Sequence, residues 1–89
     1  MPSVRVLLFG PAKDAMGGVH FIDIDLALLP IRVIDIRTAI SEQYSKLSFV
    51  LMNSIFAVGN AMVPRSLEAQ HIIADLHQEI VLVPPVSGG

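Results

Sequence analysis

The sequence predicts an α+β fold in which one main helix packs against one face of a small mixed sheet. Three observations support this prediction. Residues 3–9 are largely apolar and residues 19–25 alternate between apolar and polar, which suits an opening hairpin. Residues 33–47 form a single amphipathic stretch, and residues 80–83 are an unbroken apolar segment. A hairpin followed by a long helix and further strands is an α+β arrangement. The 89 residues are expected to form one domain with a simple core.

The two opening segments have the period of two that is typical of half-buried strands. Apolar side chains recur on one face of each segment: Val4, Val6 and Leu8 in the first, and Ile22 and Ile24 in the second. On the opposite face, Asp23 and Asp25 are expected to be charges that face solvent at an edge of the sheet. Glycine and proline between the segments interrupt the chain, which favours a hairpin.

The amphipathic stretch predicts a helix over residues 33–47. Its apolar stripe has spacings of three and four: Val33, Ile36, Ile40, Tyr44 and Leu47. The start of this helix is weakly signalled, because Arg32 occupies the position where Ser, Thr or Asp would cap it. Asp35 in the first turn suits the helix dipole and is expected to compensate in part. Residues 47–54 fit either a continuation of the helix or a buried loop.

The last third of the chain predicts the central strand of the sheet. Residues 55–63 indicate two short strands around the turn dipeptide Gly59-Asn60. The unbroken apolar run 80–83 favours a strand covered on both faces, which can pair parallel to the first strand after a long crossover. This order is that of a β-grasp, or ubiquitin-like, domain. We expect the domain to span residues 1–84 and a flexible Gly-Gly tail to follow over residues 85–89.

Composition and charge exclude several classes of function. The chain is 53% hydrophobic and 16% charged, which argues against disorder and suggests apolar surface beyond what one small core hides. Lys and Arg are dispersed and the net charge is −2, so a nucleic-acid-binding surface is not expected. No apolar run reaches the length of a membrane span, and the N-terminus lacks the features of a signal peptide. The expected location is cytoplasmic.

Motifs for an autonomous active site are absent from the sequence. The chain contains no cysteine, so thiolate metal sites, cysteine nucleophiles and side-chain persulfides are excluded. The three histidines lack metal-ligand spacing, and we expect no metal site. Neither a phosphate-binding P-loop nor a nucleophile elbow is present, so catalysis by the chain alone is not expected.

The segment PPVSGG, residues 84–89, offers different chemistry. Two prolines favour an extended path, and a glycine pair without Cβ atoms can enter a narrow channel. The α-carboxylate of Gly89 would become an acyl electrophile on adenylation, and sulfur could then replace the adenylate to leave a thiocarboxylate. The ATP and the sulfur would have to come from partners. An inert linker remnant is the alternative explanation of SGG.

Four segments of the chain resemble the small, sulfur-carrier subunit of molybdopterin synthase, a β-grasp family. They are VRVLLFGPAKDAMG, VIDIRTAI, IFAVGNAMV and EIVLVPPVSGG, and together they extend over nearly the whole length. The last segment is the most specific, because PPVSGG is a much sharper signal than a terminal glycine pair.

This resemblance implies a function and a set of site residues. An E1-like enzyme would adenylate Gly89, and the resulting thiocarboxylate would donate sulfur to cyclic pyranopterin monophosphate, forming the dithiolene of molybdopterin. The chain itself would bind no cofactor, since ATP and a sulfur donor are used by the activating partner. The large synthase subunit would form a heterotetramer of two small and two large subunits. The residues implied in tail insertion are Pro84, Pro85, Val86, Ser87 and Gly88, and those implied in partner binding are Phe9 and Val83.

Three departures from the family pattern concern local turns, and other functions stay open. His77-Gln78-Glu79 replaces the usual Gly-Asp-Glu turn, Arg32 replaces a Thr-like cap, and Gly59-Asn60 replaces the commoner Asn-Gly order. The alternatives are a sulfur carrier of the thiamine pathway, a protein modifier conjugated through Gly89, and a β-grasp binding module with an inert tail.

Overall fold

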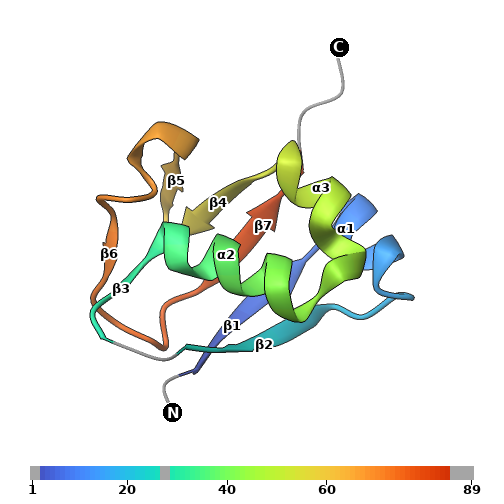
Figure 1. The fold of residues 1–89 in the computed structure, drawn as a ribbon, viewed down its shortest axis with the longest axis horizontal. Helices are drawn as coiled ribbons and strands as arrows, with labels where there is room; N and C mark the ends of the chain where they lie inside the picture. Colours follow the sequence, from blue (N-terminus) through green and yellow to red (C-terminus); the bar gives the residue numbers. More distant parts are fainter. Residues whose placement is uncertain (1–2, 27–28, 85–89) are drawn as a thin grey trace.

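The computed structural model describes residues 3–26 and 29–84 and shows the predicted α+β architecture (Figure 1). A mixed sheet of five strands has the order β2-β1-β7-β4-β5, and helix α2 crosses one of its faces. The strands are β1 (Ser3–Leu8), β2 (Phe21–Asp25), β4 (Ile55–Val58), β5 (Ala61–Val63) and β7 (Ile80–Val83).

The pairing of the strands confirms the two main predictions about the sheet. β1 and β2 form the expected antiparallel hairpin, with Val6 opposite Ile22. β7 is the central strand: it runs parallel to β1, with Leu8 opposite Leu82, and antiparallel to β4 on its other side. The short hairpin of β4 and β5 turns at Gly59, whose φ of +60° suits glycine.

The core lies between the sheet and α2 (Val33–Gln43). Alternate residues of each strand point into it, as the period of two predicts. The residues without solvent exposure include Val6, Leu8, Ile24, Phe56, Ile80 and Leu82 from the sheet and Val33, Ile36 and Ile40 from the helix. Helix and sheet therefore enclose one apolar core, in keeping with a single small domain.

Helix α2 is shorter than predicted: it ends at Gln43 and does not continue to residue 47. Tyr44 leaves the helical conformation with φ −132° and ψ 75°. A 3₁₀ turn, η1 (Ser45–Leu47), and the short helix α3 (Ser48–Met52) follow. Residues 47–54 are therefore largely helical, but in a separate short helix and not in the continuation of α2 that was one of the two possibilities.

The end of α2 also closes an edge of the sheet. The Tyr44 hydroxyl donates a hydrogen bond to the carbonyl oxygen of Asp23 at 2.9 Å, and Gln43 Nε2 donates to that of Asp25 at 2.9 Å. Both carbonyls belong to β2, the strand that ends the sheet on this side. Satisfying such groups protects an edge strand from pairing with another chain.

The start of α2 shows how the missing cap is replaced. The carboxylate of Asp35 accepts a hydrogen bond from the Arg32 backbone N–H at 2.9 Å, as expected from its place in the first turn. The next two N–H groups donate to carbonyls of a distant segment: Val33 to His71 at 3.0 Å and Ile34 to Glu68 at 3.1 Å. Tertiary contacts thus satisfy donors that usually depend on a cap.

The remaining elements are short. Helix α1 (Gly10–Ala15) follows β1, and the 3₁₀ turn η2 (Arg65–Leu67) follows β5. β3 (Ile31–Arg32) and β6 (Ile72–Ile73) pair in a second sheet of two strands, which sequence patterns did not predict. In the described part of the chain, no helix is long and apolar enough to cross a membrane.

Candidate functional site

The described part of the predicted site lies where β7 ends. Val83 is the last residue of that strand, Pro84 follows it, and both are half-buried. The other residues assigned to the tail lie outside the described residues: Pro85, Val86, Ser87, Gly88 and Gly89. The structure therefore shows the place where the tail leaves the sheet, which we call the tail exit and define by Val83 and Pro84.

The tail exit is flanked by segments that are distant in sequence. Ile55, the first residue of β4, lies opposite Val83. On the other side, Leu8 lies opposite Leu82, so that the next residue of the chain, Phe9, comes to the level of Val83. The Phe9 side chain is 52% exposed. The two residues that the family resemblance assigned to partner binding, Phe9 and Val83, are thus brought together at one end of the sheet.

Gly10 turns the chain away from β1 beside the tail exit. Its φ is +54°, in the left-handed region that other L-residues avoid. A Cβ atom added there would lie 3.9 Å from Pro84 Cγ, which is an ordinary contact. Backbone conformation, and not lack of space, is therefore the reason for glycine at this position.

We expect Gly10→Ala to lower the free energy of unfolding by about 1–2 kcal/mol, because alanine is strained in the left-handed conformation. Urea denaturation of both proteins measures the change. Gly10→Asn is the matched control, since asparagine tolerates this conformation better, and it should lose less stability than the alanine variant. An alanine variant as stable as the original protein would contradict this explanation of Gly10.

The sheet face turned away from α2 carries a continuous apolar surface. Register places one half-buried or exposed apolar residue of every strand in a single row: Phe21, Leu7, Val81, Ala57 and Met62. A second row, at the tail exit, consists of Phe9, Val83 and Ile55. We call these two rows the open sheet face. A contiguous exposed apolar surface of this kind is typical of a protein-binding site.

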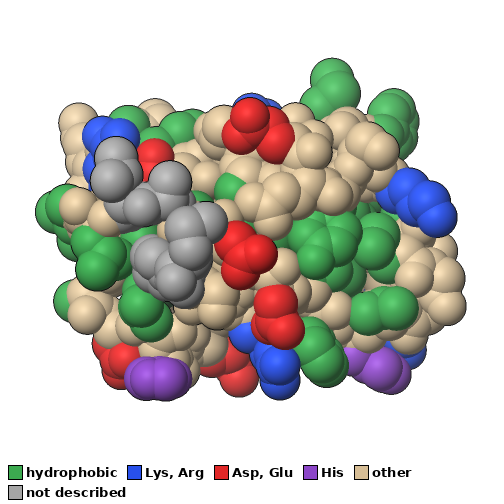
Figure 2. Space-filling view, turned by 60° about the horizontal axis from the view of Figure 1, so that its bottom comes forward, with side chains coloured by type: hydrophobic (Ala, Val, Ile, Leu, Met, Phe, Trp, Pro, Cys, Tyr) green, Lys and Arg blue, Asp and Glu red, His purple; other side chains and the backbone are tan. Residues whose placement is uncertain are grey.

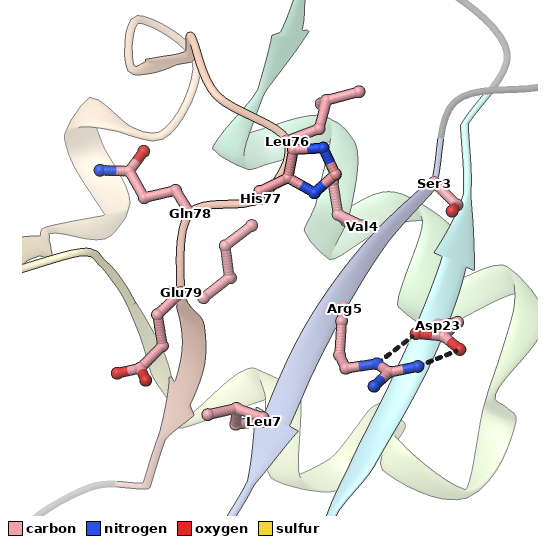
Figure 3. A pocket seen from close by; sticks show the side chains of 10 residues that line it. Ser3, Val4, Arg5, Leu7, Asp23, Leu76, His77, Gln78 and Glu79 are labelled. Carbon is pink, nitrogen blue, oxygen red and sulfur yellow. Dashed lines mark hydrogen bonds and ion pairs between the residues drawn. The ribbon is translucent and has the colours of Figure 1, made fainter.

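A groove of about 480 Å³ lies at the opposite end of β1 and β7 (Figure 3). Arg5 and Asp23 line one side, and residues 76–79 line the other. Arg5 Nε lies 2.9 Å from Asp23 Oδ1, and the guanidinium carbon lies 3.9 Å from the centre of the Phe21 ring. The hydrogen bond from Arg5 lowers the pKa of Asp23. Because these two charges neutralise each other and the groove lies at the end of the strands opposite the tail exit, we do not include it in the candidate site.

Arg5→Ala is expected to raise the pKa of Asp23 toward its ordinary value of 3.8, because the guanidinium that favours the carboxylate is removed. A carboxyl group whose pKa is lower in the folded than in the unfolded state stabilises the fold at pH values above the unfolded-state pKa. This contribution is lost as the pH falls through the folded-state pKa. Carboxyl NMR titration measures the change. Arg5→Lys, which keeps the charge, should show a smaller rise, and an unchanged pKa in Arg5→Ala would show that another group lowers it.

Charge and metal-ligand patterns add no further site in the described residues. On the face drawn in Figure 2, acidic and basic side chains are dispersed, with hydrophobic side chains between them. Within residues 3–26 and 29–84, no three His, Asp or Glu side chains are grouped so that they could hold a metal ion. The buried polar side chains there all have hydrogen-bond partners: Arg37, Ser54 and Glu68.

Sequence reasoning missed two exposed residues near the tail exit. Phe49 and Met52 lie on α3, and their exposed fractions are 77% and 64%. Their spacing of three residues places them on one face of the helix. That spacing was the available signal, but residues 49–52 are all apolar, so the sequence did not indicate which of their side chains face solvent.

Comparisons with known proteins support the fold. A scan of protein-family models finds no match, and no curated protein matches the chain. Among solved structures, SAMP1 from Haloferax volcanii has a TM-score of 0.73 at 22% identity, covering 98% of this chain and 99% of its own. The small archaeal modifier protein 1 from Methanosarcina acetivorans has a TM-score of 0.70 at 24% identity, with coverage of 100% and 98%.

A third structure is a complex of subunits 1 and 2 of the molybdopterin-converting factor from Helicobacter pylori. A chain of this complex matches with a TM-score of 0.54 at 24% identity, covering 98% of this chain and 99% of its own. The matches extend over whole chains, so the protein has the ubiquitin-like β-grasp fold that the order of its elements predicted. At these identities the likeness establishes the fold.

Proposed function

We propose that the chain is the sulfur-carrier subunit of a molybdopterin synthase, with Gly89 as the residue that carries sulfur. The observation that supports this most is the position of the tail. The PPVSGG segment begins at the end of the central strand β7, at Pro84, beside an open and apolar sheet face. The core holds the root of the tail in place, while the apolar surface next to it suits a docked partner.

The proposed chemistry takes place at the α-carboxylate of Gly89. A carboxylate oxygen attacks the α-phosphorus of ATP on an E1-like enzyme, and pyrophosphate leaves. Hydrosulfide supplied by a donor then attacks the acyl carbon, AMP leaves, and a thiocarboxylate remains. The thiocarboxylate sulfur forms a bond to cyclic pyranopterin monophosphate on the large subunit, and water then cleaves the bond between this sulfur and the acyl carbon, which leaves sulfur on the pterin and regenerates the carboxylate. The described residues contribute the binding surface and the anchored start of the tail.

The large subunit is the partner proposed for the open sheet face. The rows that contain Leu7, Val81 and Val83 provide apolar area of the kind found at the centre of protein interfaces. A chain with this fold occurs in the Helicobacter pylori complex of subunits 1 and 2 of molybdopterin-converting factor, which supports such a partner. We propose the assembly of two small and two large subunits.

A second candidate function is that of a protein modifier, conjugated through Gly89 to lysine amines. The two small archaeal modifier proteins have TM-scores of 0.73 and 0.70, whereas the chain from the converting-factor complex has 0.54, and this difference favours the second candidate. Both functions begin with adenylation of Gly89. They differ in the nucleophile that attacks the adenylate, which is sulfur for the carrier and an amine for the modifier.

Molybdopterin formation in a reconstituted reaction tests the first function. Thiocarboxylated chain is mixed with the large synthase subunit of the source organism and cyclic pyranopterin monophosphate, and we expect molybdopterin to form in proportion to the thiocarboxylate supplied. Failure to form it, despite a verified thiocarboxylate and an active large subunit, would contradict this function. Proteolysis after Glu79 tests the second, because a conjugate would leave residues 80–89 attached to a target lysine.

A further inference from the structure

We infer that the exposed face of α3, formed by Phe49 and Met52, is a second docking surface for the large subunit. This inference rests on the proposed function. The two side chains are 77% and 64% exposed, whereas Leu51 between them is buried in the core. α3 packs beside α2 on the helix side of the sheet, so this surface and the open sheet face lie on different sides of the domain.

The connection between α3 and β4 places this surface near the tail exit. Met52 ends α3, and Ile55 begins β4 three residues later. Ile55 lies opposite Val83, the last residue of β7. Figure 1 shows α3 beside the end of β7. The tail exit therefore lies between the Phe9 side of the sheet and the end of α3.

The length of the tail restricts where a partner can dock. Five residues follow Pro84 up to Gly89, and an extended chain spans at most about 3.6 Å per residue, or about 18 Å in all. A partner whose reaction site holds Gly89 must therefore place the mouth of its tail channel close to Val83 and Pro84. Surfaces that flank the tail exit, including the end of α3, are then expected to be covered by that partner.

Charge around α3 indicates the chemistry of the covering surface. The net charge of the whole chain is −2, but residues 43–67 contain Lys46 and Arg65 and no acidic residue. Arg65 Nη1 donates to the carbonyl oxygen of Met52 at 2.7 Å, which holds this cation against α3. The matching partner surface is an apolar patch with an acidic rim. We assign it to the large subunit, because a chain of this fold is found in the complex of subunits 1 and 2 of molybdopterin-converting factor.

The test compares binding of the large subunit by three variants with that of the original protein, using calorimetry. Phe49→Ala/Met52→Ala is expected to raise the Kd on the order of tenfold or more, as truncation of interface anchors does. Lys46→Glu is expected to raise the Kd and to reduce its dependence on salt. Ile72→Ala, which truncates an exposed residue of β6, is the matched control and should bind unchanged. Thermal unfolding of each variant verifies the fold.

The results separate this inference from the proposed function. If the double variant binds the large subunit as tightly as the original protein does, the inference about α3 is overturned while the function stands. If it binds normally but is thiolated slowly by the E1-like enzyme, the surface belongs to that enzyme and the inference is again overturned. If the original protein does not bind the large subunit at all, the proposed function itself fails.

Discussion

Glu68→Ala is expected to lower the free energy of unfolding by about 3–5 kcal/mol, because it leaves a buried guanidinium without its counter-charge. Glu68 is 1% exposed and accepts two hydrogen bonds from Arg37, at 2.8 Å and 2.7 Å. Arg37 is 8% exposed and also donates to the carbonyl oxygens of Leu51 and Ser54. The side chain of Arg37 thus joins α2 to the segments that contain Glu68, Leu51 and Ser54. The total free energy of unfolding of a small domain is on the order of 5–15 kcal/mol, so the expected loss is a large part of it.

Equilibrium denaturation by urea measures this loss. The exposed pair of Arg5 and Asp23 provides the matched control, since both side chains are more than half exposed and Asp23→Ala should change stability little. Arg37→Met/Glu68→Leu removes both charges and should be more stable than Glu68→Ala, although the carbonyls of Leu51 and Ser54 lose a donor. A Glu68→Ala variant no less stable than Asp23→Ala would contradict the importance of the buried pair.

Deletion of Gly89 is expected to lower sulfur transfer by on the order of a hundredfold or more, because small displacements of a reacting group have effects of this size. The new terminus, Gly88, would fall short by about 3.3–3.6 Å, the span of one extended residue. Molybdopterin formation under single-turnover conditions measures the loss.

Binding of the large subunit should survive this deletion, because the open sheet face and the tail exit are unchanged. The informative pair is therefore the Gly89 deletion and Val83→Asp, which places a charge in the second row of the open sheet face. The deletion should lose transfer and keep binding, whereas Val83→Asp should weaken binding. Full activity of the deletion variant would contradict the role of Gly89.

Alternation within strands was sufficient to predict most of the sheet. Val4, Val6 and Leu8 are buried as expected, and so are Ile22 and Ile24. The unbroken run 80–83 correctly predicted a central strand parallel to the first. The expectation that both faces of this strand are covered was wrong, because Val81 and Val83 are only half-buried on the open sheet face. These features depend on local periodicity and on burial, which a sequence displays directly.

Features that depend on distant contacts were not predictable in the same way. The helix was expected to reach residue 47, because the apolar spacing continues past the true end, where Tyr44 turns to hydrogen-bond with β2. The pair of Arg37 and Glu68 is separated by 31 residues, and no motif links them. A signal did exist: Arg37 is four residues after Val33 and three before Ile40, so a charged residue shares the apolar face of the helix.

The open sheet face was predictable in part. Composition indicated excess apolar surface, and the family resemblance implied Phe9 and Val83 as contact residues. The row from Phe21 to Met62 depends on the register of five strands, which the sequence does not specify beyond the opening hairpin. The role of Phe49 and Met52 was missed because the exposed side of α3 is set by its packing against α2.

The mass of the C-terminal peptide tests the central claim most directly. The chain is incubated with ATP, the E1-like enzyme of the source organism and a sulfur donor, and the peptide of residues 80–89 is released by cleavage after Glu79. The proposed function predicts a gain equal to the exchange of one oxygen for one sulfur, located on Gly89. A peptide of unchanged mass, under conditions in which a known carrier is thiolated, would contradict it.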